Sequence, residues 1–204
     1  MFIKSIYNSN NKENINRLSE VYEDIDKLIL YIKQLQNDSK LDLSHFYGNR
    51  ILIKPNWVRH NIKEIDSLCL TTHPNFILAV LDIILDNKPR EVIIADAPIQ
   101  GCIWDKLLPT EFYEHINNKE RETGIPIKVL DLRRKEFHEQ ELVDNKRDIS
   151  NYVLFDLKEN SYLESITSAK NKFRVTDYNP NRLAESHSKG KHQYCIAKEV
   201  FEAD

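Results

Sequence analysis

Polar and charged side chains follow three short apolar runs of the sequence, at the point where each run ends. Lys54 and Asn56 follow the run ILI, Asp96 closes the run VIIA, and Arg133 comes shortly after the run IKVL. Lys54 and Arg133 are suited to hold an anion such as a phosphate or a carboxylate. Asp96 is suited to act as a base, to orient a sugar hydroxyl or to help hold a metal. These residue types predict a site for a small anionic or sugar-like ligand, with Asp96 as the candidate catalytic group.

The same residues also have an ordinary structural interpretation. Lys and Asp at strand ends are often solvated turn residues, and Lys54 and Asp96 then form only an ion pair. Ligands of open parallel sheets bind in the crevice beyond the carboxyl ends of the strands, so both interpretations concern the same place. The sequence has four glycines and contains neither GxGxxG nor GxxxxGK[ST]. This counts against a Rossmann dehydrogenase and a P-loop enzyme, and it leaves the cofactor open.

Three histidines are further candidate ligand-binding residues. His73 stands directly before Pro74 at an expected helix start, where exposed N–H groups favour anions. His187 and His192 lie five residues apart in a polar segment near the end of the sequence. Two histidines without a third nearby ligand do not make a metal site, and none is predicted. A solvated loop tip and a contact with a small ligand stay open as alternatives for this pair.

Tryptophan and cysteine residues offer less specific chemistry. Trp57 and Trp104 follow the first and second expected strands, where a Trp either forms the floor of a sugar or aromatic site or packs a loop. Cys102 is a candidate nucleophile only beside a base such as His73 or His187, and a buried inert thiol is the more frequent environment. The cysteines form no CxxC pair, which argues against a zinc or iron–sulfur site and agrees with reduced thiols: Cys69, Cys102 and Cys195.

The elements that position these residues are predicted from apolar spacing. Apolar residues at three- and four-residue steps predict an amphipathic helix over 15–36, and a helical turn is expected in 41–47. Runs rich in β-branched residues are typical of buried strands: 51–53, 91–96 and 126–131. Helices are expected between them, from Pro74 to the 87–89 stretch and from Thr110, as the candidate cap, to about residue 122. A strand–helix–strand order implies parallel pairing.

The remaining segments complete the expected architecture. Strands are predicted at 152–156 and 173–177, a short first strand at 1–7, and a hairpin or a loose charge-rich segment over 131–150. The fold class is therefore α/β: a mostly parallel sheet of about five strands with flanking helices in three layers. We expect residues 1–49 to form a helical segment packed on an α/β domain of residues 50–204.

The composition narrows the class of partner. Hydrophobic residues make up 41% and charged residues 30% of the 204-residue chain, as in globular proteins. The net charge of −3 counts against nucleic acid, which needs a strongly basic face. No apolar run is long enough for a bilayer, and no signal-peptide pattern opens the sequence. The expectation is a cytoplasmic protein with neither a nucleic-acid nor a membrane partner.

Four motifs, in this order and spacing, resemble the family called "domain of unknown function 362". They are ILIKPNWV, TTHP before an amphipathic helix, EVIIADAPIQGC, and DYNP followed by SHSKGKHQYCIAKEVFEAD, and the correspondence covers 50–204. The DAPIQGC form resembles a branch found among bacterial cell-surface polysaccharide genes. The resemblance therefore implies a role in surface-polysaccharide biosynthesis, without naming a reaction. Some relatives carry ferredoxin-like cysteine modules, which this sequence lacks.

The resemblance also implies that the sequence is the N-terminal part of a longer family member, because relatives continue with a further strand after the segment that resembles EVFEAD. A missing strand leaves an open sheet edge, at which a second copy or a partner chain can pair. Three hypotheses stay open: an enzyme acting on the metabolite, a non-catalytic binding or assembly protein, and an inactive remnant.

Overall fold

The computed structural model describes residues 20–63, 66, 70–138, 141–164 and 184–204. The described chain divides into two compact units, and each is considered by itself. The parallel-sheet unit lies within 1–98 and 102–131 and includes Asp204. The antiparallel unit comprises 99–101 and the described residues of 132–203.

Three parallel strands form the sheet of the first unit, in the order β1-β2-β3. They are β1 (Arg50–Ile53), β2 (Glu91–Asp96) and β3 (Ile127–Asp131). β2 is the central strand and is buried along its whole length, which is why it reads as a continuous apolar run. Because Asp96 is in register with Asp131, the carboxyl ends of these two strands meet at one edge of the sheet.

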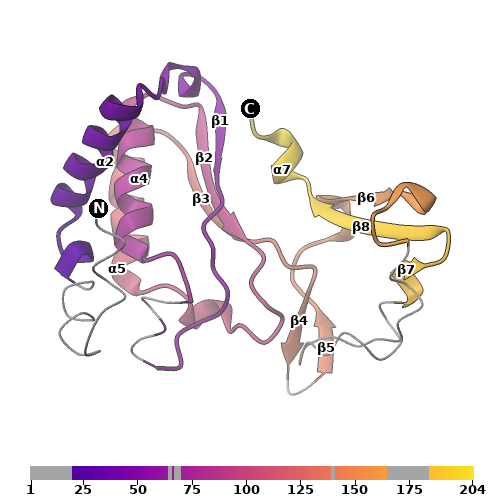
Figure 1. Ribbon diagram of the computed structural model, residues 1–204. Helices are drawn as coiled ribbons and strands as arrows, with labels where there is room; N and C mark the ends of the chain where they lie inside the picture. Colours follow the sequence, from indigo (N-terminus) through magenta and orange to yellow (C-terminus); the bar gives the residue numbers. More distant parts are fainter. Residues whose placement is uncertain (1–19, 64–65, 67–69, 139–140, 165–183) are drawn as a thin grey trace, which may run out of the picture. The chain divides into compact units, whose positions relative to one another are not determined.

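Among the described residues of this unit, the helices α2 (Ile25–Ser39), α4 (Pro74–Asp86) and α5 (Thr110–Thr123) all lie on the same side of the sheet in Figure 1. α4 carries the apolar residues that meet the sheet, and its Ile77, Leu81 and Ile84 join Val92 and Ile94 of β2 in one buried cluster. α5 begins after Pro109, so Thr110 is its first helical residue and not its cap, and it ends at Gly124 in the left-handed region (φ 69°).

The predicted N-terminal helix does not run unbroken from residue 15 to residue 36. Asp24 has extended backbone angles, and its side chain accepts a hydrogen bond from the Lys27 N–H at 3.1 Å. This cap starts α2 at Ile25, because an Asp in that position satisfies a first-turn N–H group. Residues 15–19 lie outside the described residues. The predicted turn in 41–47 is confirmed as a short 3₁₀ helix, Ser44–Phe46.

The described residues of the second unit form two antiparallel sheets. β4 (Lys135–His138) and β5 (Glu141–Asp144) form a hairpin, which confirms one of the two alternatives for 131–150. β8 (Lys191–Ala197) lies between β6 (Tyr152–Asp156) and β7 (His187–Ser188), in the order β6-β8-β7. A short helix, α7 (Glu199–Glu202), follows β8.

The chain is therefore mixed α/β with a parallel sheet, but a mostly parallel sheet of about five strands is not confirmed. The predicted strand at 152–156 exists, yet it pairs antiparallel with β8. Parallel pairing needs a crossover connection, usually a helix, and the chain between β3 and β6 instead contains the β4–β5 hairpin. Three layers are not seen among the described residues, because α2, α4 and α5 share one side of the sheet (Figure 1). The strands predicted at 1–7 and 173–177 lie outside the described residues.

Asp204 meets the first residue of the edge strand β1. Its backbone N–H donates to the carbonyl of Arg50 at 3.0 Å, and its carboxylate accepts from the Arg50 N–H at 2.9 Å. These bonds pair the backbone N–H and carbonyl of Arg50, at the start of the edge strand β1. Pairing of this edge with another chain stays a prediction. Within the described part of the chain, no helix has the length and apolar character needed to cross a membrane.

Candidate functional site

Asp96 connects the carboxyl ends of β1 and β2 to the loop that follows β1. The side chain is buried, with 5% exposed. Its Oδ1 lies 2.7 Å from Nζ of Lys54 and accepts from the Ala97 N–H at 2.8 Å, while Oδ2 accepts from the backbone N–H of Trp57 at 2.7 Å. The carboxylate thus fixes Trp57 in place. The ion pair with Lys54 is present, and a role for Asp96 as a base stays a prediction.

Asn56 and Thr72 fix the other side of the same loop. The Asn56 N–H donates to Oγ1 of Thr72 at 2.9 Å, and the Thr72 N–H donates to the Asn56 carbonyl at 3.0 Å. Trp57 also forms an antiparallel bridge with Thr71. This pairing brings the chain after β1 beside the start of α4. The TTHP motif is therefore next to Trp57 in space.

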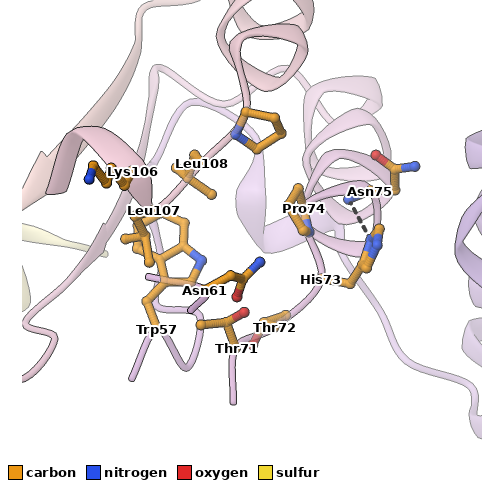
Figure 2. Close-up of a pocket in the computed structure, with 11 residues that line it drawn as sticks. Trp57, Asn61, Thr71, Thr72, His73, Pro74, Asn75, Lys106, Leu107 and Leu108 are labelled. Atoms are coloured by element: carbon orange, nitrogen blue, oxygen red, sulfur yellow. Dashed lines mark hydrogen bonds between the residues drawn. The ribbon is translucent and has the colours of Figure 1, made fainter. Parts of the chain in front are cut away.

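A pocket of about 350 Å³ lies at this place, and we call it the Trp57 pocket. Figure 2 shows Trp57 on one wall and the start of α4 opposite. The chain that leads into α5 supplies a third wall. The apolar lining consists of Pro74, Leu107, Leu108 and Pro109, and the polar lining includes Asn61, Thr71, Thr72, Asn75 and Lys106. The volume is at the small end of the range for ligand pockets.

The indole of Trp57 is buried, with 1% exposed, and packs edge-on against Trp104 with ring centroids 5.7 Å apart. Its Nε1–H group has no hydrogen-bond acceptor within the part of the chain that the structure describes. Figure 2 shows this nitrogen on the ring edge that faces Asn61. A buried donor without an acceptor costs about 1–3 kcal/mol. This nitrogen is itself buried, so the unpaired donor reflects the packing around the ring.

His73 caps α4. Its Nδ1 accepts from the Asn75 N–H at 3.2 Å, so the ring proton is on Nε2. The ring stacks on Tyr22 at 4.4 Å between centroids and is half-buried. Burial lowers the pKa of His73 below its usual value, because it disfavours the charged form. His73 is thus neutral at neutral pH. The start of α4 was predicted to attract anions, but one of its N–H groups, that of Asn75, already donates to the His73 side chain.

Arg133 belongs to the antiparallel unit and is buried, with 4% exposed. Its Nη1 donates to the carbonyls of Ile99 and Gln100 at 3.1 and 3.2 Å, and Nη2 lies 3.4 Å from the Glu136 carboxylate. These contacts attach the 99–101 segment to the rest of its unit. Anion binding by Arg133 stays a prediction, and the contacts described here are structural.

His187 and His192 come together in the antiparallel unit as cross-strand partners of β7 and β8. Their Nδ1 atoms lie 3.4 Å apart, and Nε2 of the fully buried His192 lies 2.8 Å from Oε2 of Glu164. We call these three residues the His192 cluster. The Gly190 N–H donates to Glu164 and, with His192, holds the pKa of that carboxyl below its usual range. A solvated loop tip is therefore the wrong interpretation for His192.

Cys102 has the environment of an inert thiol. It is buried, with 3% exposed, and its Sγ accepts from the backbone N–H of His60 at 3.2 Å. Cys195 is exposed, and Cys69 lies outside the described residues. Among the described residues, no three His, Cys, Asp or Glu side chains gather in a way that could hold a metal ion.

Some residues of the pocket were not candidates from the sequence. Lys106 lies in the 3₁₀ helix Trp104–Lys106 before α5, and Asn61 lies in an irregular loop. Neither position has a spacing or a flanking motif that marks it. The sequence predicted that Trp57 either forms the floor of a sugar or aromatic site or packs a loop. It could not predict that the indole N–H is buried without an acceptor among the described residues, because that depends on the atoms around the ring. Glu164 likewise gives no sequence signal, because its partner His192 is far along the chain.

The comparisons with known proteins give one match. The sequence profile of the family described as "Domain of unknown function (DUF362)" matches residues 51–155, which is just over half of the chain. This span contains β1 from Ile51 onwards, α4, β2, α5 and β3, together with every residue named above as lining the Trp57 pocket. No curated protein and no solved structure gives a significant match.

Proposed function

We propose that this chain, which belongs to the family described as domain of unknown function 362, binds a small anionic or sugar-like metabolite in the Trp57 pocket. The observation that carries the proposal is the pocket of about 350 Å³ that Trp57, the start of α4 and the chain before α5 line together.

The position of the pocket in the fold supports the proposal. Parallel α/β sheets bind ligands beyond the carboxyl ends of their strands, and Trp57 follows β1 directly at that end. Asp96, at the end of β2, holds the Trp57 backbone with a 2.7 Å hydrogen bond. The site is therefore preorganised by a buried carboxylate on the central strand, which lowers the entropy that a ligand must lose to bind.

The biological setting is proposed from the sequence. The DAPIQGC segment after β2 resembles a branch found near surface-polysaccharide genes, and this supports a metabolite of surface-polysaccharide biosynthesis bound in the cytoplasm. An enzymatic role for Asp96 belongs to the same proposal and requires that the bound ligand reach its carboxylate. A change in surface-polysaccharide output on replacing Trp57 by Phe in cells tests this setting.

Binding is tested by thermal shift with a panel of sugar nucleotides, sugar phosphates and organic acids, followed by NMR. A ligand that binds only the folded chain raises its melting temperature. The chain has two tryptophans, so a spectrum of the ¹⁵N-labelled protein contains two indole signals. We expect a ligand to move the signal that Trp57→Phe removes, and to lose its thermal shift in that variant. A panel that leaves this signal unmoved throughout contradicts the proposal.

A further inference from the structure

The helix α2 has an apolar inner side and a partly apolar outer side. On the inner side Leu28 is buried, with 4% exposed, and Ile25 packs against the core of the parallel-sheet unit. The outer side carries three large apolar residues that are exposed: Leu30 and Leu35 with 66% each, and Tyr31 with 57%. Figure 1 shows α2 on the far side of α4 from the sheet. The outer side of α2 therefore faces away from the core of its own unit.

Six exposed residues share this outer side, because they follow one another at steps of three or four residues in two adjacent rows. We call them the α2 outer face: Lys27, Leu30, Tyr31, Gln34, Leu35 and Asp38. The face is positive near the start of the helix, apolar in the middle and negative near the end. The helix dipole favours the opposite order of charge, so Lys27 and Asp38 do not stabilise α2 by that route.

The charges of the α2 outer face are complementary to those of a second copy that runs in the opposite direction. Lys27 and Asp38 are equally far from the centre of the face, which falls between Ile32 and Lys33. In an antiparallel pair with a two-fold axis at this centre, Lys27 of each copy therefore lies opposite Asp38 of the other. Lys27 also lies 3.2 Å from Asp24 of its own chain, but these side chains are 68% and 41% exposed, and a pair of this kind contributes little.

The apolar residues obey the same symmetry. Leu30 and Leu35 are equally far from the centre, so Leu30 of one copy lies level with Leu35 of the second copy. Tyr31 lies closer to the centre, so the apolar side chains of both copies meet in the middle of the pair. A parallel pair would instead place Lys27 against Lys27 and Asp38 against Asp38, and like charges repel. The face is thus self-complementary in the way that a two-fold interface requires.

We propose that the α2 outer face binds a second copy of this chain as an antiparallel, two-fold pair of helices. Lys27 of each copy pairs with Asp38 of the other, and the exposed leucines and Tyr31 pack between these charges. A contact between two helices of 15 residues is small, so we expect a weak dimer with a dissociation constant on the order of 100 μM. None of the described residues that line the Trp57 pocket belongs to α2, so the dimer leaves that pocket accessible.

Sedimentation equilibrium of the complete 204-residue chain tests the proposal at concentrations from about 5 μM to about 500 μM. We expect monomers at the lowest concentration and mostly dimers at the highest. Leu35→Glu places two carboxylates in the apolar middle of the pair and is expected to raise the dissociation constant at least about tenfold. Because Leu35 is exposed, the melting temperature of the monomer is expected to stay unchanged.

Ile62→Glu is the matched control for this substitution. Ile62 is 64% exposed, nearly as much as Leu35, and lies in the loop after β1 and outside α2. The same charge is thus added to an apolar surface residue elsewhere in the unit. We expect the dissociation constant of Ile62→Glu to equal that of the unmodified chain.

Reversal of the two charges tests the direction of the pair. Lys27→Asp sets two carboxylates against each other at both ends of the dimer, and Asp38→Lys does the same with two ammonium groups. Each is expected to raise the dissociation constant about fivefold. Both substitutions in one chain restore opposite charges, so the dissociation constant is expected to return to within about twofold of its original value. Added salt reduces these differences, because the charges are exposed.

Three results overturn the proposal. The first is a chain that stays monomeric over the whole range of concentration. The second is a dimer that Leu35→Glu leaves as stable as before, since the copies then meet at another surface such as a sheet edge. The third is a doubly reversed chain that dimerises no better than the single variants, since the helices are then not antiparallel. Binding of a metabolite in the Trp57 pocket is independent of all three.

Discussion

The His192 cluster and the Trp57 pocket both contain buried polar groups, but only those of the cluster have hydrogen-bond partners among the described residues. Both ring nitrogens of His192 have partners, at 2.8 Å from Glu164 and 3.4 Å from His187. The indole nitrogen of Trp57 is nearly as buried and has no acceptor among the described residues. A buried group with partners contributes to stability and to a unique arrangement of its strands, whereas one without a partner costs stability. The difference indicates that the buried polar groups of the first region stabilise its fold, whereas the indole nitrogen of the second does not.

The largest expected effect comes from breaking the cluster that has its partners. His192→Leu keeps the apolar volume but removes the central member, so His187 and Glu164 both lose a hydrogen bond. Glu164 is 28% exposed in the ion pair and can turn to water, which moderates the loss. We expect the free energy of unfolding of the antiparallel unit to fall by about 2 kcal/mol. Hydrogen exchange of the β8 amides measures it.

Tyr162→Leu is the control for this substitution, because Tyr162 is a fully exposed residue of the same unit. A surface change of this kind is expected to stay within about 0.5 kcal/mol. If the β8 amides exchange no faster in His192→Leu than in the control, the cluster does not hold the unit together and the contrast with Trp57 is lost.

The sequence predicted elements well where one local rule decides them. The β1–α4–β2 unit follows from two apolar runs and a helix that starts at Pro74, and the Asn87–Pro89 stretch ends that helix at Asp86. The N-terminal helix was predicted less well, since apolar periodicity continues through Asp24. The cap that interrupts it depends on one hydrogen bond, from the Lys27 N–H to the Asp24 side chain. The orientation of β6 could not be read from YVLFD, because alternation within a strand carries no information on the direction of its partner.

The sequence predicted one contact of the candidate site, but of the predicted site residues only His73 lines the Trp57 pocket. The sequence predicted that Lys54 and Asp96 lie together, because both follow parallel strands that end at the same edge of the sheet, and the structure has them 2.7 Å apart. The orphan donor of Trp57 depends on the absence of an acceptor, which no spacing encodes. The pairing of His192 with Glu164 joins residues 28 apart in sequence, so it required the structure.

A medium effect is expected from protonating the cluster. Burial and the neighbouring His192 lower the pKa of His187 below its usual value near 6.5. The unfolded chain therefore binds this proton at a higher pH than the folded chain does. Stability contributed by neutral His187 is present above pH 6.5 and is lost as the pH falls from there towards the lower folded pKa. The lowered pKa of Glu164 adds a loss of the same sign at more acidic pH, below about 4.5.

The pH effect is measured as the opening free energy of the β8 amides between pH 7.5 and pH 5, corrected for intrinsic exchange rates. His187→Gln is expected to flatten the dependence over this window, because it removes the group whose folded and unfolded pKa values differ. His45→Gln, outside the antiparallel unit, is the control and is expected to leave the slope unchanged. An equal slope in His187→Gln and in the unmodified chain contradicts the assignment.

The smallest stability effect is expected where the polar group has no partner. Trp57→Phe removes the orphan N–H and part of the ring contact with Trp104, so a gain from losing an unpaired donor offsets a loss of packing. We expect the melting temperature of the parallel-sheet unit to change by an amount equivalent to about 1 kcal/mol or less, while binding of a ligand of the Trp57 pocket is lost. Trp104 fluorescence follows unfolding in both proteins.

If Trp57→Phe lowers the free energy of unfolding by more than about 3 kcal/mol, which is typical of an aromatic residue of the core, then the role of Trp57 is packing and not ligand binding. A small stability change together with lost binding distinguishes the Trp57 pocket from the His192 cluster, because His192→Leu is expected to lower stability and to leave binding in the pocket unchanged.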